Sequence, residues 1–169
     1  MMGVSASAQF TSRFVMLHPD RIKAASIGAP GYGPIVPVAQ WKGKAVPYHT
    51  GVADLESLIG QKFDVVTFRE VPLQIYVGDM DTNIVPWYRP SSDSEVALIE
   101  ELFGGGGAEE FWRWANYEAA YASVQSASQF LVFPGMGHRW EDWSYMKEFF
   151  ERQKEMVEGI SVMKVLQEA

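Results

Sequence analysis

The sequence has no cysteine among its 169 residues, which excludes disulfide bonds, thiolate metal sites and thiol nucleophiles. It also lacks an apolar run long enough to cross a bilayer. Basic residues are fewer than acidic ones, 14 against 21, and the formal net charge is -7 at pH 7. Because a surface of that sign repels phosphate backbones and anionic lipid headgroups, we expect neither a nucleic acid nor a membrane as a partner.

The first residues lack the basic and then apolar pattern of a signal peptide. This slightly favours a cytoplasmic location, although an export signal in an upstream part of a longer chain would change that expectation. Apolar residues make up 47% of the sequence and aromatic residues 14%, which is typical of a globular protein with a substantial core. The length suits one domain, so we predict a single domain over residues 1–169.

Apolar periodicity and turn residues divide the chain into alternating strands and helices. Strands are expected at residues 23–27, 71–77 and 130–133. Helices are expected at residues 6–17, 54–59, 94–103 (with Ser94 as its cap), 109–124 and from about 142 onwards. This alternation predicts an α/β fold with a mostly parallel sheet between two layers of helices, a three-layer αβα arrangement. Functional residues of such sheets gather at the carboxyl ends of strands, which here are the start of the chain, residues 78–83 and residues 134–138.

The first of these places contains Ser5 within the run Gly3-Val4-Ser5-Ala6-Ser7. A serine hydroxyl becomes a nucleophile when a base removes its proton and the oxygen stands clear of the backbone. A tight turn from strand to helix achieves this, but it crowds the positions two before and two after the serine, which must be small. Gly3 and Ser7 meet that requirement. In the alternative interpretation, Ser5 or Ser7 merely caps the helix that follows.

The second place is the segment VGDMDTNIVP, which offers two carboxylates, Asp79 and Asp81. A carboxylate there can orient an imidazole and stabilise its protonated form. An aspartate-rich turn that closes the strand is the simpler interpretation. A calcium loop is rejected, because Ile84 stands where the turn needs glycine and Pro90 where the bidentate glutamate belongs. We therefore expect no metal.

The third place is the loop FPGMGHRWED, which contains His138. Of the three histidines, only this one lies in a glycine-flanked loop directly after a buried strand. His18 stands at a helix end before proline, and His49 lies in an irregular segment. Serine, then aspartate, then histidine at successive strand ends is one specific order, and the three together are far more informative than any one alone.

The run GVSASAQFTSRFVMLHPDRIKAASIGAPG resembles the nucleophile elbow, helix and next strand of the α/β-hydrolase family, in its esterase and polyester-depolymerase-like branch. VPLQIYVGDMDTNIVP resembles the acid-bearing strand end of that family, and FPGMGHRWEDW resembles its histidine loop. The similarity covers roughly residues 3–150. It implies Ser5 as nucleophile, His138 as general base, Asp81 as the acid with Asp79 as second choice, and the N–H of Ala6 as an oxyanion donor.

Two features depart from the family pattern. The last glycine of the elbow is replaced by Ser7, and only two methionines precede Gly3. Family members have four or five strands upstream, including the strand that leads into the elbow and the loop that supplies a second oxyanion donor. We therefore expect a partial α/β-hydrolase fold without its N-terminal strands. A missing upstream half, a partner chain or a self-associated homo-oligomer would cover the exposed sheet edge.

Together these features predict hydrolysis of a small-molecule carboxylic ester through an acyl-enzyme, without a metal or organic cofactor. The ester chemistry is implied by the family resemblance as much as by the residues, and the acyl and alcohol groups stay open. Loss of one oxyanion donor typically lowers the rate by ~10²–10³. The alternative is a catalytically inactive fragment or interaction module that keeps the three side chains but lacks the rest of the site.

Overall fold

The computed structural model describes residues 1–31, 33–82, 93–104, 113–138 and 143–167. It has two compact units, Met1–Arg139 and Trp140–Ala169, and each is considered by itself. The predicted single domain therefore stays a prediction. The first residues of two predicted helices, 109–112 and 142, lie outside the described residues.

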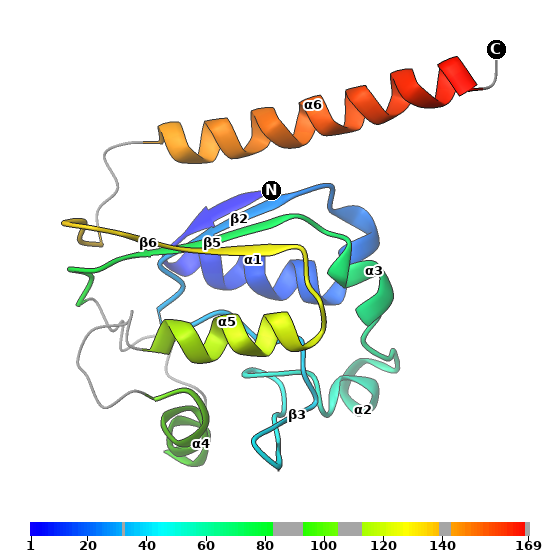
Figure 1. Cartoon of the computed structure of the whole chain (residues 1–169). Helices are drawn as coiled ribbons and strands as arrows, with labels where there is room; N and C mark the ends of the chain where they lie inside the picture. Colours follow the sequence, from blue (N-terminus) through cyan, green and yellow to red (C-terminus); the bar gives the residue numbers. More distant parts are fainter. Residues whose placement is uncertain (32, 83–92, 105–112, 139–142, 168–169) are drawn as a thin grey trace. The chain divides into compact units, whose positions relative to one another are not determined.

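A parallel four-stranded sheet forms the centre of the first unit, in the order β1-β2-β5-β6. Its strands are β1 (Met2–Val4), β2 (Ala25–Gly28), β5 (Leu73–Gly78) and β6 (Ser128–Phe133). Since all four strands run in the same direction, their carboxyl ends lie along one edge of the sheet, on the left in Figure 1. The α/β class and the parallel sheet predicted from the sequence are confirmed.

Helices and a small hairpin occupy the connections between these strands. The remaining elements of the first unit are α1 (Ala6–Leu17), η1 (Pro19–Arg21), β3 (Gln40–Trp41), β4 (Lys44–Ala45), α2 (Leu55–Ile59), α3 (Val65–Arg69), α4 (Asp93–Phe103) and α5 (Trp114–Ser123). Both α1 and α5 lie on the same side of the sheet (Figure 1). The second unit contains α6 (Ser144–Gln167). Among the described residues, no helix combines the length and the apolar character needed to span a membrane.

The expected elements are present, with small shifts at their ends. The helix around residues 54–59 appears as α2. The expected strand at 23–27 begins two residues later, as β2. The proposed cap Ser94 is wrong, because α4 already includes Asp93 and Ser94 therefore lies inside the helix. The sequence reasoning missed β1, the β3–β4 hairpin and α3, because each is only two to five residues long and too short to show a periodic pattern.

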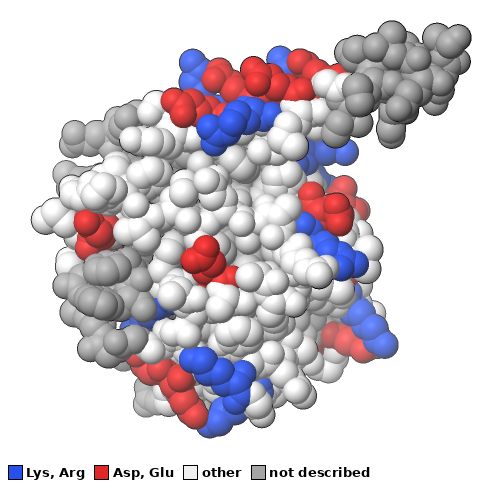
Figure 2. Space-filling view, viewed as in Figure 1, with Lys and Arg blue, Asp and Glu red and all other residues white. Residues whose placement is uncertain are grey.

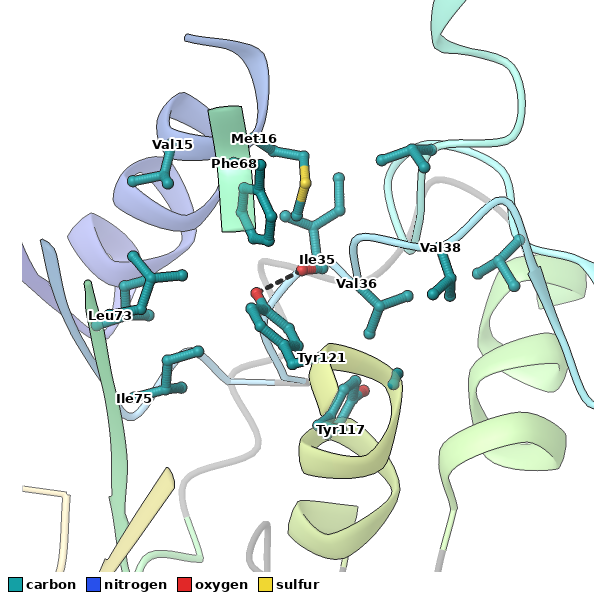
Figure 3. Close-up of a cluster of buried hydrophobic side chains, with 14 of the residues drawn as sticks. Val15, Met16, Ile35, Val36, Val38, Phe68, Leu73, Ile75, Tyr117 and Tyr121 are labelled. Atoms are coloured by element: carbon teal, nitrogen blue, oxygen red, sulfur yellow. Dashed lines mark hydrogen bonds between the residues drawn. The ribbon is translucent and has the colours of Figure 1, made fainter. Parts of the chain in front are cut away.

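Alternate residues of the two central strands build the core. The side chains that they contribute to the main hydrophobic cluster are Ala25, Ile27, Leu73, Ile75 and Val77. The facing helices contribute Ala8, Val15 and Met16 from α1 and Tyr117 and Tyr121 from α5 (Figure 3). Because successive strand residues point to opposite faces, this set defines the face of the sheet that α1 covers.

A polar clamp joins α1, α5 and the chain after β2 inside this core. The hydroxyl of Tyr121 donates to the carbonyl of Ile35 at 2.7 Å, as Figure 3 shows. The N–H of Ile35 donates to Ser12 Oγ at 3.1 Å. Burial raises the pKa of the Tyr121 hydroxyl above its ordinary value, and a hydrogen bond with Ser12 lowers it by less. The hydroxyl therefore stays protonated at neutral pH and remains available as a donor.

The surface carries charges of both signs. On the described part of the face shown in Figure 2, acidic and basic side chains are interspersed and most of the area between them is uncharged. Neither sign gathers there into one continuous patch.

Replacing Tyr121 with phenylalanine tests the clamp. Because the carbonyl of Ile35 then loses its buried donor, we expect Tyr121→Phe to lower the free energy of unfolding by about 1–3 kcal/mol in a denaturant titration. Tyr48→Phe is the control, because its hydroxyl makes no hydrogen bond among the described residues. An equal loss of stability in both variants would show that the clamp contributes nothing specific.

Candidate active site

Ser5 joins the sheet to the first helix through its own backbone. Its N–H donates to the carbonyl of Gly28 at 2.9 Å, which continues the pairing of β1 with β2. Its carbonyl accepts the N–H groups of Ala8 at 3.0 Å and Gln9 at 3.2 Å, which begins α1. The change of direction between strand and helix therefore falls on this single residue.

The backbone of Ser5 has φ 57° and ψ -122°. Residues other than glycine rarely adopt a positive φ, and such a conformation costs roughly 1–3 kcal/mol. The side chain makes no capping hydrogen bond to α1. Ser5 occupies the N-cap position of α1, but its hydroxyl does not cap the helix. The strained turn is of the kind that displays a hydroxyl clear of its own helix.

The residues on either side of Ser5 are crowded, as the sequence reasoning predicted. A Cβ on Gly3 would overlap the carbonyl of Ser7 and would lie 2.6 Å from Thr11 Oγ1. The Ser7 hydroxyl donates to the carbonyl of Val4 at 2.8 Å and accepts the N–H of Val4 at 2.9 Å. Glycine is thus required at position 3. Ser7, which replaces the last glycine of the elbow pattern, stabilises the turn through its two hydrogen bonds to Val4.

The sheet has an edge strand, β1, that was not expected from the sequence. The strand that leads into the serine turn was expected to be absent, and this is wrong, because Met2–Val4 forms it. Backbone groups of Met1 and Ser5 bond to β2, so those of Met2 and Val4 point to the other side by alternation. Ser7 satisfies both groups of Val4, which leaves the outward backbone groups of Met2 at the open edge.

Asp81 and His138 lie together after the ends of β5 and β6. His138 Nδ1 is 2.9 Å from Asp81 Oδ2. The Asp81 side chain is fully buried, whereas 23% of the His138 side chain is exposed. An ionised carboxylate can only accept, so Nδ1 of a neutral imidazole then carries the proton and Nε2 is the nitrogen that can accept a hydrogen bond. The pair thus has one buried end and one end that reaches solvent.

Asp79 has a different partner. Its Oδ1 accepts the N–H of Gly135 at 2.7 Å, in the loop that precedes His138. Of the two carboxylates considered from the sequence, the one beside the imidazole is therefore Asp81. This geometry favours Asp81 over Asp79 as the orienting acid, and the catalytic role of either stays a prediction.

Ser5 shares the carboxyl edge of the sheet with this pair. It follows β1, and β2 lies between β1 and β5 in the sheet. Among the described residues, no hydrogen bond joins the Ser5 side chain to His138. The structure therefore brings Asp81 and His138 into direct contact and places Ser5 at the same edge of the sheet, with no hydrogen bond to His138 among the described residues.

The N–H groups of Ala6 and Ser7 open α1 and have no acceptor among the described residues. Free N–H groups at the start of a helix can stabilise an anion. Ala6 is therefore available for the oxyanion role that the sequence predicted, and that role also stays a prediction.

The other two histidines lie against aromatic rings. The ring centroids of His18 and Phe14 are 4.9 Å apart, and those of His49 and Tyr48 are 4.7 Å apart. The sequence reasoning gave no role to Gly78, yet a Cβ there would overlap the carbonyl of Met136 in the loop before His138. A glycine at the end of β5 was the only visible signal, and it also fits an ordinary strand end.

No family model matches the sequence, and no curated protein is significantly similar to it. Solved structures are similar in fold. Poly(aspartic acid) hydrolase-1 from Sphingomonas sp. KT-1 is 23% identical with a TM-score of 0.53, over 82% of this chain and 48% of that one. That similarity, together with the parallel sheet and its connecting helices, identifies the fold. The chain has part of an α/β-hydrolase fold.

Two further structures match with lower scores. The poly(3-hydroxybutyrate) depolymerase LpqC from Bordetella parapertussis is 20% identical over 88% of this chain and 53% of that one, with a TM-score of 0.49. SOBER1 from Arabidopsis thaliana is 14% identical over 90% and 51%, with a TM-score of 0.46. The chain spans about half the length of these solved structures.

Replacing Gly3 with alanine tests the crowding of the serine turn. Because the added Cβ meets backbone rather than a flexible side chain, we expect Gly3→Ala to destabilise the chain by about 1–3 kcal/mol in a denaturant titration. Gly137→Ala is the control, because a Cβ there comes no nearer than 3.8 Å to the carbonyl of Met80. Unchanged stability of Gly3→Ala would contradict the tight turn.

Proposed function

We propose that the chain carries the catalytic residues of a serine hydrolase that cleaves carboxylic esters through an acyl-enzyme. Ser5 is the nucleophile, His138 the general base and then acid, and Asp81 the residue that orients the imidazole. The observation that supports this most strongly is the 2.9 Å contact between Asp81 and His138, at the sheet edge that also carries the strained Ser5.

The proposed reaction begins when Ser5 Oγ attacks the carbonyl carbon of the ester. Its proton passes to His138 Nε2, while the Asp81 carboxylate stabilises the imidazolium through the Nδ1–H. The N–H of Ala6 donates to the oxyanion of the tetrahedral intermediate. When the intermediate collapses, the alcohol leaves with the proton from Nε2. Water then attacks the acyl-enzyme with His138 again as base, which releases the acid and restores the Ser5 hydroxyl.

The strained turn supports this mechanism through its geometry. The side-chain oxygen of a serine that caps its helix accepts a hydrogen bond from a backbone N–H, whereas Ser5 makes no such bond. Ala6 and Ser7 directly follow Ser5 in the sequence, and their N–H groups have no acceptor among the described residues. The turn therefore combines a displayed hydroxyl with donors suited to developing negative charge.

Covalent labelling tests the nucleophile. We expect a fluorophosphonate probe to label the purified chain at Ser5, with the site assigned by mass spectrometry of the labelled peptide. Ser5→Ala abolishes the label. Asp81→Asn slows labelling by roughly 10²–10⁴, because the amide stabilises the imidazolium less and can favour the wrong tautomer.

Two controls sharpen the labelling experiment. Ser57→Ala removes the hydroxyl of an exposed serine in α2 and keeps the label, since the mechanism does not use that hydroxyl. Circular dichroism establishes that each variant is folded. A folded chain that takes no label would contradict the proposal and favour the inactive interaction module.

We also propose that a further strand pairs with the open edge of β1. It comes from a second copy of the chain or from a segment equivalent to the N-terminal half of the α/β-hydrolase fold. The outward backbone groups of Met2 support this, because they have no partner among the described residues and unpaired edge groups are a ready template for another strand. The 48% coverage of the Sphingomonas enzyme supports it too, because the rest of that fold has no counterpart in this chain.

Sedimentation velocity over a range of concentrations tests this partner. If a second copy pairs at the edge, the chain associates, and Met2→Pro weakens the association because proline removes the outward N–H. Met2→Val keeps the N–H and is the control. A chain that stays monomeric and still labels at Ser5 as fast as a complete serine hydrolase would contradict the need for any further strand.

A further inference from the structure

We propose that Asp79 is a positioning residue, whose side chain fixes the loop of residues 134–138 so that the His138 ring faces Asp81. The inference rests on the proposed function for its catalytic consequence. Its structural part, the dependence of the Asp81–His138 pair on Asp79, stands on geometry alone.

Asp79 holds the loop by two of its own groups. The backbone N–H donates to the carbonyl of Phe133 at 3.1 Å, where β6 ends. The Oδ1 atom accepts the N–H of Gly135 at 2.7 Å, two residues further on. The acceptor at this position holds the N–H of Gly135, so the side chain fixes the beginning of the loop.

The next residues continue the contact toward the imidazole. The N–H of Met80 donates to the carbonyl of Met136 at 3.0 Å. That carbonyl lies over Gly78, where any Cβ would overlap it. Asp81 then meets His138 at 2.9 Å. Asp79 thus contacts Phe133 and Gly135, and the two residues after it contact Met136 and His138 in turn. Asp79 makes the first contacts of this series.

Burial does little to hold this loop. Pro134 and Gly135 are exposed, and within the described part of the chain a Cβ on Gly137 would have only the carbonyl of Met80 within 4 Å, at 3.8 Å. A loop with few buried apolar contacts depends on its polar contacts for a fixed conformation. The Asp79 carboxylate supplies one such contact, three residues before His138.

The simpler interpretation of Asp79 is a local turn former. An aspartate in that role bonds to the backbone about two residues further along its own chain. Asp79 bonds instead to Gly135, 56 residues away, and the N–H of Asp81 is taken by the carbonyl of Gly78 at 3.1 Å. The side chain therefore connects two loops rather than closing one turn.

Three substitutions at position 79 separate positioning from charge. Asp79→Ala removes the acceptor and the charge, Asp79→Asn removes only the charge, and Asp79→Glu keeps the charge but displaces the acceptor by one methylene. If position matters, the asparagine variant behaves like the wild type and the other two are impaired. Asp20 is an exposed acidic residue of η1, and Asp20→Ala is the matched control.

The first readout is the nuclear magnetic resonance signal of the His138 Nδ1–H in chain labelled with ¹⁵N-histidine. Only three histidines are present, and Asp81→Ala identifies the signal by removing its acceptor. We expect a proton protected from exchange in the wild type and in Asp79→Asn, and its loss in Asp79→Ala and Asp79→Glu. Melting curves establish that each variant is folded, and the glutamate variant carries the test if the alanine variant does not fold.

The second readout is the rate of fluorophosphonate labelling at Ser5. Because a displacement of about 1 Å can cost about 10²-fold in rate, we expect Asp79→Ala and Asp79→Glu to label roughly 10–10²-fold more slowly. Asparagine restores the rate. Asp79→Ala with an unchanged Nδ1–H signal, or asparagine as impaired as alanine, would overturn the inference.

The two readouts also separate this inference from the proposed function. If the wild type takes no label but its Nδ1–H signal depends on Asp79 as described, the hydrolase proposal fails and the positioning role is supported. If Ser5 is labelled and Asp79→Ala changes neither readout, the positioning role fails and the hydrolase proposal is unaffected.

Discussion

The backbone of Ser5 is the constraint on which the rest of the arrangement depends. Its N–H completes the pairing of β1 with β2, and its carbonyl starts α1. One residue therefore belongs to a sheet and to a helix, and the positive φ is the cost of serving both. The small residues around it and the burial of α1 against the sheet hold the turn against that strain.

The second half of the candidate site is built by contact between two loops. Residues 79–81 run beside residues 133–138, and this contact determines which carboxylate reaches the imidazole. The turn at Ser5 follows β1, and the two loops in contact follow β5 and β6. The parallel sheet connects these two parts of the candidate site. Strand direction brings them to one edge, and the order of strands sets how far apart they lie.

Much of this arrangement could be predicted from the sequence. The apolar runs that became β2, β5 and β6 and the small residues around Ser5 gave the fold class and the serine turn. The strand β1 was missed because three residues show no alternation, and β3, β4 and α3 are equally short. The role of Asp79 could not be predicted, because a contact with Gly135 depends on the spatial register of two loops and leaves no local pattern.

A crystal structure of the chain after reaction with a fluorophosphonate is the most direct test of the proposed mechanism. We expect phosphorus bonded to Ser5 Oγ, a phosphoryl oxygen within hydrogen-bond distance of the Ala6 N–H, and His138 Nε2 within reach of Ser5 Oγ while Nδ1 stays on Asp81. A phosphonylated residue other than Ser5, or an imidazole that remains out of reach of it, would contradict the account.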